Sequence, residues 1–383
     1  MATNGHRALR IAQVAPLYES VPPRLYDGTE RIVSYLTEGL IEAGHDVTLF
    51  ASGDSCTAAR LVACCGRALR LAGCAEALAW HLAMIEEVAC RAHEFDLVHF
   101  HIDYLHFPIS KRERYRHVTT LHGRLDLPEL VPIFEQSAEM PVVSISDAQR
   151  RPLPDLAWQA TVYHGFPEEL YHLEPRPGDY LAFLGRVSPE KGLDRAIEIA
   201  GRAGYRLRVA AKIDLADRDY FTGVIAPLLR QRHVEYLGEI GERDKQELLG
   251  GALALVFPID WPEPFGMVMV EAMACGTPVI AYCRGSVPEV IDHGVTGLIC
   301  DDLAQAVAAV ARVHELSRAT CRRVFEQRFT AARMTHDYVS IYRRMLDHID
   351  HTFDGYDGYD GHDRRDQPDP RGLLHPRYHH ARG

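Results

Sequence analysis

The sequence lacks any run of about 18 apolar residues without a charge or a chain breaker, the length that a membrane-spanning helix needs. Its first residues, MATNGHRALRIAQVAP, also lack the apolar core of a signal peptide. We therefore expect a soluble protein of the cytoplasm.

An excess of positive charge is also missing. The 42 Lys and Arg residues are outnumbered by 53 Asp and Glu, so the formal net charge is −11. Nucleic-acid-binding surfaces are strongly basic, and we expect no nucleic-acid partner. One short basic cluster would be attracted to an anionic membrane or acceptor, although a solvated loop explains four charges in an acidic chain better. It consists of Lys111, Arg112, Arg114 and Arg116.

Signatures of metal and dinucleotide sites are absent as well. The nine cysteines are scattered without the paired spacing of a zinc site, and they are typical of reduced intracellular thiols. No G-x-G-x-x-G follows the first expected strand, in LRIAQVAPLYES, which argues against a dehydrogenase. No Asp-x-Asp lies in an expected strand-end loop. We expect neither a metal ion nor another cofactor.

What the sequence does contain is an alternation of short apolar stretches with amphipathic ones. The expected strands of the first half are LRIAQVA, DVTLFAS, DLVHFH, HVTTLH and PVVSIS, and those of the second half are YLAFLG, YRLRVAA, VEYLG, LALVFP, PVIAY and GLIC. A helix is expected over residues 29–43. This alternation predicts an α/β protein with doubly wound parallel sheets.

The pattern restarts after a polar, Pro-rich stretch at residues 165–179, which predicts two Rossmann-like lobes with a ligand cleft between them. We place an N-terminal domain at residues 1–170 and a C-terminal domain at residues 171–330. Residues 331–349 predict one amphipathic helix, and residues 350–383 a disordered low-complexity tail. The apolar residues of that helix are Met334, Tyr338, Ile341, Tyr342 and Met345.

The stretch LAFLGRVSPEKGLDRAIEIA predicts a phosphate-binding loop. A strand ends near Gly185, a loop carries Arg186 and Lys191, and an amphipathic helix follows. In a parallel sheet this places two cations beside a helix N-terminus, where free N–H groups favour anions. An Arg and a Lys together suit a diphosphate. Taken alone, a solvated loop explains the two cations equally well.

A second strand-loop-helix unit lies in LALVFPIDWPEPFGMVMVEAMACGTPV. The backbone N–H groups of residues 265–268 (Phe265, Gly266, Met267 and Val268) would face a ligand at the start of a helix that stops at Gly276. Two such helix starts in one lobe indicate a single polyanionic ligand.

Two carboxylates belong to this second unit. If Glu263 and Glu271 were both helical, they would lie about 12 Å apart along the axis, too far to share a scissile bond as a glycosidase pair does. They would touch different parts of one ligand. A structural role beside the helix terminus is the alternative for Glu263, whereas Glu271 lies among apolar residues and needs a hydrogen-bond partner if it is buried.

These motifs together resemble the donor lobe of retaining glycosyltransferases of family 4, which are nucleotide-sugar-dependent enzymes of the two-lobe GT-B type. RVSPEKG, EPFGMVMVE and ACGTPV carry the resemblance, and DGTERIVSYL, TTLHG, VSISDAQR and VYHGF agree with it. The resemblance implies that Arg186 and Lys191 hold the donor diphosphate, Glu271 the ribose and Glu263 the transferred sugar. It places backbone support at residues 265–268 and the base near Ile240.

In the first lobe, His122 of TTLHG is expected at the carboxyl end of a strand, facing the cleft, and by the resemblance beside the transferred sugar. His99 and His101 share one strand face, for which a packing or cleft-lining role is expected. Gly28 matches a glycine of the family's first loop, while Asp27 stands where relatives carry a second glycine. Ser146 and Gln149 read as a helix-capping box, which is a structural role.

The resemblance implies transfer of a hexose from a UDP- or GDP-sugar to a sugar, a lipid-linked or another small acceptor, with retained anomeric configuration. Fixed cations and helix termini would supply the charge that a metal supplies elsewhere. The helix at residues 331–349 would cross back to the first lobe. An epimerase of the same build and a non-catalytic sugar-nucleotide-binding protein are the alternatives.

Overall fold

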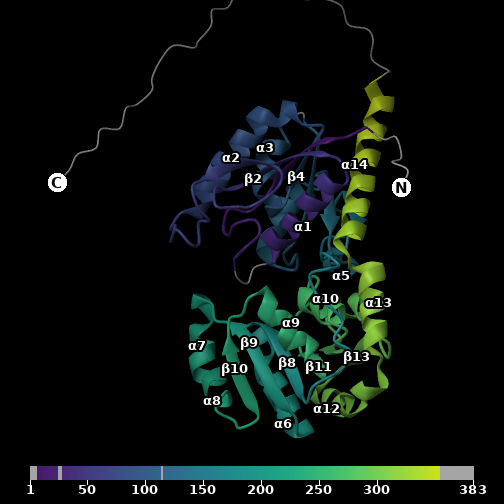
Figure 1. Ribbon diagram of the computed structural model, residues 1–383. Coiled ribbons are helices and arrows are strands. Elements are labelled where there is room, and N and C mark those ends of the chain that lie inside the picture. The colour runs from purple at the N-terminus through teal and green to yellow at the C-terminus, as the bar shows by residue number, and fades with distance from the viewer. Residues whose placement is uncertain (1–6, 25–27, 114, 354–383) are drawn as a thin grey trace, which may run out of the picture. The chain divides into compact units, whose positions relative to one another are not determined.

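The computed structural model describes residues 7–24, 28–113 and 115–353, with side chains described as far as residue 347. It contains two parallel sheets within one compact unit, Met1–Leu346 (Figure 1). The first sheet has the order β3-β2-β1-β4-β5-β6-β7 and the second β10-β9-β8-β11-β12-β13. The predicted α/β fold with two doubly wound sheets is confirmed. None of the described helices is both long and apolar enough to cross a membrane.

The first sheet is built from residues 10–161. Its strands are β1 (Arg10–Val14), β2 (Asp46–Ser52), β3 (Arg60–Cys65), β4 (Leu97–Phe100), β5 (His117–Thr120), β6 (Val142–Ser144) and β7 (Trp158–Thr161). The α-helices around it are α1 (Thr29–Glu42), α2 (Ala77–Arg91), α3 (Phe107–Ser110), α4 (Val131–Gln136) and α5 (Asp147–Arg150).

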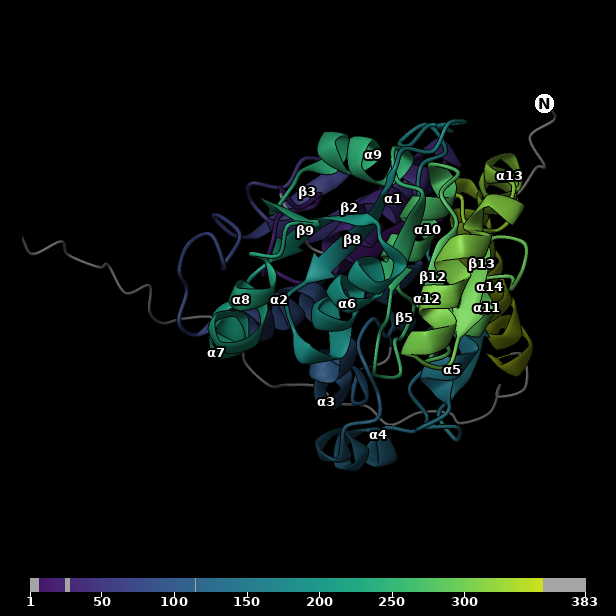
Figure 2. The ribbon, with the colours of Figure 1, turned by 90° about the horizontal axis from the view of Figure 1, so that it is seen from below.

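The second sheet is built from residues 180–300. Its strands are β8 (Tyr180–Arg186), β9 (Arg206–Lys212), β10 (Val234–Gly238), β11 (Ala254–Phe257), β12 (Val279–Tyr282) and β13 (Gly297–Cys300). Its α-helices are α6 (Leu193–Ala203), α7 (Arg218–Tyr220), α8 (Ala226–Leu228), α9 (Glu242–Gly250), α10 (Met267–Ala274), α11 (Val287–Val290), α12 (Leu303–Arg312) and α13 (Arg318–Arg328). The apolar core on one face involves α6 and α12, and that on the other involves α9, α10 and α13 (Figure 2).

Every strand expected from the sequence is present, and two further strands were missed. These are β3 and β7, which form the two edges of the first sheet. Edge strands bury less of their surface: Leu61 and Val62 of β3 and all four residues of β7 are only partly buried. Their sequences therefore carry a weaker apolar signal than the central strands.

The long helix α14 (Ala331–Phe353) packs on the first sheet, although it follows the second in the chain. Its buried Met334, Tyr338 and Tyr342 join a core with Ile11 and Val118. The helix ends four residues beyond the expected Ile349. The predicted tail otherwise lies outside the described residues, from residue 354 onward.

We predict that truncating the chain after Arg328 destabilises the first lobe. Burial of a large apolar side chain contributes about 1.5–3 kcal/mol, and α14 buries Met334, Tyr338, Ile341 and Tyr342 at no more than 2% exposure. The truncated chain should be insoluble or should unfold in less urea than the full chain. A chain ending at residue 353 serves as the control. Equal urea midpoints for the two truncations would contradict the prediction.

Candidate active site

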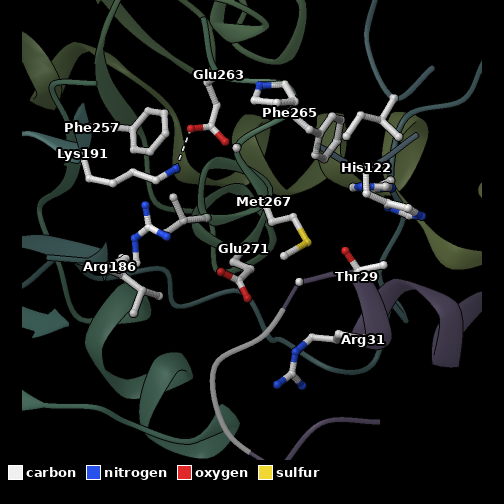
Figure 3. A pocket seen from close by; sticks show the side chains of 18 of the residues that line it. Thr29, Arg31, His122, Arg186, Lys191, Phe257, Glu263, Phe265, Met267 and Glu271 are labelled. Carbon is white, nitrogen blue, oxygen red and sulfur yellow. Dashed lines mark hydrogen bonds and ion pairs between the residues drawn. The ribbon is translucent and has the colours of Figure 1, made fainter. Parts of the chain in front are cut away.

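A cavity of about 380 Å³ lies where residues of both lobes meet (Figure 3). Ten of the eleven site residues predicted from the sequence line it, and Ile240 does not. Those ten are Gly28, His122, Arg186, Lys191, Glu263, Phe265, Gly266, Met267, Val268 and Glu271. Ile240 packs instead against the core of the second lobe. Its contact with a base stays a prediction.

The order of the second sheet brings the two predicted ligand loops together. Strands β8 and β11 are neighbours and parallel, so the loops that follow them leave the same edge of the sheet. The Asp260 N–H donates to the carbonyl of Glu190 over 2.8 Å and ties one loop to the other. Gly192 has φ +72°, and a Cβ there would lie 2.4 Å from the Pro258 carbonyl oxygen. Only glycine allows this approach.

Lys191 is held by a carboxylate at the cavity wall. Its Nζ lies 2.6 Å from Glu263 Oε2, which also accepts a bond of 2.8 Å from Trp261 Nε1. The ammonium lies 5.1 Å from the centre of the Trp261 ring. Glu263 lies in the loop before α10 and is not helical. The two predicted site residues Lys191 and Glu263 therefore form one ion pair, which an anionic ligand would rearrange.

Arg186 contacts three carboxylates. Its guanidinium lies 2.7 Å from Glu190, 3.4 Å from Asp217 and 3.8 Å from Asp214. The side chain is 40% exposed, so water screens these pairs. The guanidinium borders the cavity (Figure 3). A bound diphosphate would compete with these carboxylates for it.

Glu271 is a buried carboxylate with two partners. Lys245 Nζ donates to Oε1 over 2.9 Å, and the Tyr171 hydroxyl lies 3.1 Å from the same oxygen, with its single proton shared with Glu242 Oε2 at 2.6 Å. The prediction that Glu271 needs a hydrogen-bond partner if buried is confirmed. Because both bonds use Oε1, Oε2 remains for a ligand hydroxyl. Figure 3 shows the carboxylate at the cavity wall.

Sequence reasoning missed Lys245 and Arg31, which both line the cavity. Burial disfavours the Lys245 ammonium, but the carboxylates of Glu271 and Glu242 outweigh this effect and raise its pKa above the usual value. Arg31 pairs with Glu242 over 3.0 Å. Lys245 lies in the polar stretch GERDKQE, whose composition resembles a solvated helix start, and its partner Glu271 lies 26 residues away. No local signal identified it.

Helix α10 starts at the cavity. Its N-cap Gly266 has φ +76°, and a Cβ there would lie 2.6 Å from the Met269 Cε atom. No described side chain caps this N-terminus. The helix ends at Ala274, two residues before Gly276, whose φ is +80°. The N-terminus of α10 can therefore direct N–H groups at an anion.

His122 follows β5 and lines the cavity, as the sequence predicted. Its Nε2 lies 2.9 Å from His101 Nδ1, and its ring stacks on His164 with centroids 5.3 Å apart. Burial lowers the pKa of His122 to about 3. His99 and His101 lie on one face of the strand with ring centroids 4.0 Å apart, and both are buried. The expected packing or cleft-lining role is confirmed, since both rings are packed in the interior and His101 also lines a second cavity.

The remaining predicted residues have mainly structural surroundings. Gly28 begins α1, and a Cβ there would lie 2.8 Å from the Met267 Cε atom; Asp27 lies outside the described residues. Ser146 caps α5 by accepting the Gln149 N–H over 3.0 Å, which confirms one bond of the predicted box, whereas Gln149 Oε1 accepts from the Ile145 N–H and not from that of Ser146. In the basic cluster, Lys111 pairs with Glu139 over 2.6 Å, and Arg114 lies outside the described residues.

Comparison with known proteins defines the class. A family model described as "Glycosyl transferases group 1" matches residues 172–327, and "Glycosyltransferase Family 4" matches residues 26–162. Two parallel α/β lobes around one cavity are the architecture of the GT-B glycosyltransferases. The chain belongs to this class, and within it to the glycosyltransferases of the family 4 type.

Solved structures share the fold. A glycosyltransferase involved in avilamycin A biosynthesis, AviGT4, superimposes with TM-score 0.68 and 24% identity, covering 88% of this chain and 98% of its own. HepE of Anabaena, solved with UDP and glucose, gives TM-score 0.68 at 18% identity over 88% of this chain and 100% of its own.

Curated relatives match over shorter stretches. N-acetyl-alpha-D-glucosaminyl L-malate synthase of Bacillus anthracis is 33% identical over 32% of this chain and 34% of its own length. D-inositol 3-phosphate glycosyltransferase of Kribbella flavida is 32% identical over 34% of this chain and 35% of its own. The chain spans less than half the length of these relatives.

Proposed function

We propose that this glycosyltransferase moves a hexose from a UDP- or GDP-sugar to an acceptor hydroxyl with retention of anomeric configuration. One observation carries the proposal: Lys191, Arg186, Glu271 and the start of α10 border a single cavity. Two cations and a helix N-terminus suit a diphosphate, and a carboxylate with a free oxygen suits a ribose. The structure of HepE with UDP-glucose supports such a donor by analogy.

In the proposed reaction, negative charge develops on the departing diphosphate. Cleavage of the bond between the anomeric carbon and phosphate leaves negative charge on the departing diphosphate, and fixed positive charge there lowers the barrier. Lys191 and Arg186 supply this charge in the proposal, and they take the place of a metal ion. Glu263, which now accepts from Lys191 and Trp261, would bind a hydroxyl of the transferred sugar. The leaving phosphate would help to deprotonate the acceptor during front-face attack.

A second cavity next to the donor cavity is a candidate binding site for the acceptor. It has a volume of about 300 Å³ and is lined by first-lobe residues, among them Tyr18, His81 and Asp103. Thr29 lines both cavities, so the second one adjoins the proposed donor site. Its polar lining fits a sugar or another polyol headgroup. We therefore assign the acceptor hydroxyl to this side of the donor cavity.

The donor can be identified by a thermal-shift screen of UDP-, GDP- and ADP-sugars, in which the true donor raises Tm most. The selected donor is then incubated with and without candidate acceptors, and its consumption and the anomeric configuration of the product are followed by NMR. Consumption only with an acceptor, and a retained configuration, are expected. Conversion of the sugar without any acceptor would favour an epimerase, and binding without turnover in the presence of sugar, lipid-linked and small polyol acceptors would favour a non-catalytic protein.

A further inference from the structure

A buried chain of hydrogen bonds leads from α14 to the wall of the donor cavity. The Tyr342 hydroxyl lies 2.7 Å from His99 Nδ1 and 3.4 Å from Gln13 Nε2. The other end of the Gln13 amide, Oε1, lies 2.8 Å from His101 Nε2. His101 Nδ1 then meets His122 Nε2 at 2.9 Å. The chain thus ends on a histidine that lines the cavity.

Both histidines at the end of this chain are uncharged at neutral pH. Burial lowers the pKa of His101 well below its usual value, and that of His122 to about 3. A neutral imidazole carries one N–H and one bare nitrogen. Which nitrogen of each imidazole carries the proton is therefore determined by the residue to which that ring is hydrogen-bonded.

The orientation of the Gln13 side-chain amide determines which atom donates and which accepts in each of these hydrogen bonds. In the structure the Gln13 amide presents Nε2 to the Tyr342 hydroxyl and Oε1 to His101 Nε2, and the bond to His101 is the shorter of the two. A carbonyl only accepts, so His101 Nε2 carries the proton and its Nδ1 is bare.

The tautomer of His122 depends on that of His101. Because His101 Nδ1 is bare, the bond between the two rings requires a proton on His122 Nε2. The Nδ1 of His122 is then bare. This atom is buried and has no hydrogen-bond partner in the described structure. Buried polar atoms in native proteins nearly always have a partner, and because His122 lines the cavity, a ligand group bound there can supply one.

We propose that Gln13 and His101 are positioning residues that hold His122 in its Nε2–H form, so that Nδ1 accepts a hydrogen bond from a sugar hydroxyl. The inference rests on the proposed function, because it takes the cavity as the place of the transferred sugar. It also assigns a selectivity: the site favours a hydroxyl at this position over a group that can only accept. The reverse order of protons, with the Gln13 amide turned over, would make Nδ1 a donor instead.

The first test reads the tautomer directly and needs no activity. The full chain is labelled with ¹⁵N-histidine, and His122 is assigned by comparison with the His122→Asn variant in long-range ¹H–¹⁵N spectra at pH 7.5. A protonated Nε2 and a bare Nδ1 are expected for His122. A protonated Nδ1 would overturn the proposal, whatever the enzyme transfers.

The second test adds UDP, UDP-glucose, GDP and GDP-mannose to the labelled chain. The His122 Nδ1 signal should move toward the hydrogen-bonded range with one of the two sugar nucleotides and stay in place with its diphosphate. If the sugar nucleotide binds by thermal shift but leaves Nδ1 unchanged, the inference is wrong and the proposed function stands. If none of the four binds, the donor assignment itself fails.

Variants distinguish a positioning role of Gln13, which acts through its hydrogen bond to His101, from a role in core packing alone. Gln13→Met removes the acceptor for His101 and should raise the donor KM about five-fold with kcat nearly unchanged, the effect of one neutral hydrogen bond. His122→Asn retains an acceptor near Nδ1 and should bind donor better than His122→Phe. His106→Asn is the matched control, since His106 is equally buried but bonds to Ser110 and Thr119 away from the cavity. A control that changed KM as much as Gln13→Met would show a packing effect and overturn the proposal.

Discussion

Lys191→Ala is expected to keep its fold and to lose 10²–10³-fold in kcat. Removal of one preorganised group that stabilises developing negative charge typically costs about this much. Lys191 is such a group in the proposed mechanism, with its ammonium at the cavity wall and 17% of the side chain exposed. Turnover of the donor identified by the screen is measured at saturation, and circular dichroism checks the fold.

One matched control and one variant of the partner carboxylate accompany this experiment. Lys111→Ala removes a lysine that also pairs with a glutamate, Glu139, but lies outside the cavity lining, and it should retain normal turnover. Glu263→Gln removes the carboxylate partner of Lys191 while a side chain of the same shape remains, and it tests whether that pair matters for the sugar. Near wild-type turnover of Lys191→Ala would remove the main support for the proposed mechanism.

Acid is expected to destabilise the first lobe steeply below pH 6.5. Five buried histidines have pKa values lowered chiefly by burial. They are His99, His101, His106, His122 and His164. In the unfolded chain these imidazoles take up protons near pH 6.5, whereas in the folded chain they stay neutral. Their contribution to stability is therefore present above pH 6.5 and lost as pH falls.

The expected loss of folding stability on acidification is large. For His122, whose folded pKa is about 3, the loss of stability between pH 7 and pH 5.5 is about 1.2 kcal/mol, and the other four histidines act in the same direction. Asp103 acts in the opposite direction: burial raises its pKa to about 6, so its protonation in the folded state offsets about 1 kcal/mol.

Urea unfolding at pH 7 and pH 5.5, followed by the fluorescence of the first-lobe residues Trp80 and Trp158, measures this effect. His106→Asn should be less stable at pH 7 but should lose less stability on acidification, because one proton fewer is taken up on unfolding. The exposed His93→Asn should leave the pH dependence unchanged. Equal stability of the wild-type chain at the two pH values would contradict the prediction.

The sequence predicted the central elements because burial imposes a strong pattern on them. Fully buried strands such as β4 and β11 appear as short apolar runs, and α6 shows its buried face at Leu193, Ala196 and Ile197. The edge strands β3 and β7 do not, because one side of each has no neighbouring strand to cover it. Local chemistry also predicted the Ser146 cap, which involves only residues close in the chain.

In the candidate site, too, local sequence predicted some residues and not others. Arg186 and Lys191 could be placed because a strand, a loop and a helix within about 20 residues define where their loop lies. Lys245 and Arg31 could not be placed, because their partners Glu271 and Glu242 are distant in the chain and only folding brings them near. The loop of Ile240 precedes the helix that supplies Lys245, but Ile240 is not among the residues that line the cavity, and its contact with a base stays a prediction.

The amino-acid sequence by itself determined two α/β lobes, a loop with two cations and a second loop leading to a helix start, since periodicity and glycine positions are local properties. Only the tertiary structure decided which carboxylates hold those cations: Glu263 for Lys191, and Glu190 with Asp217 for Arg186. It also brought Gln13, His101 and His122 within hydrogen-bond distance of one another. Apart from the local Arg186–Glu190 pair, these contacts depend on distances between residues far apart in the chain, and a hydrogen bond or an ion pair exists only within a few ångströms.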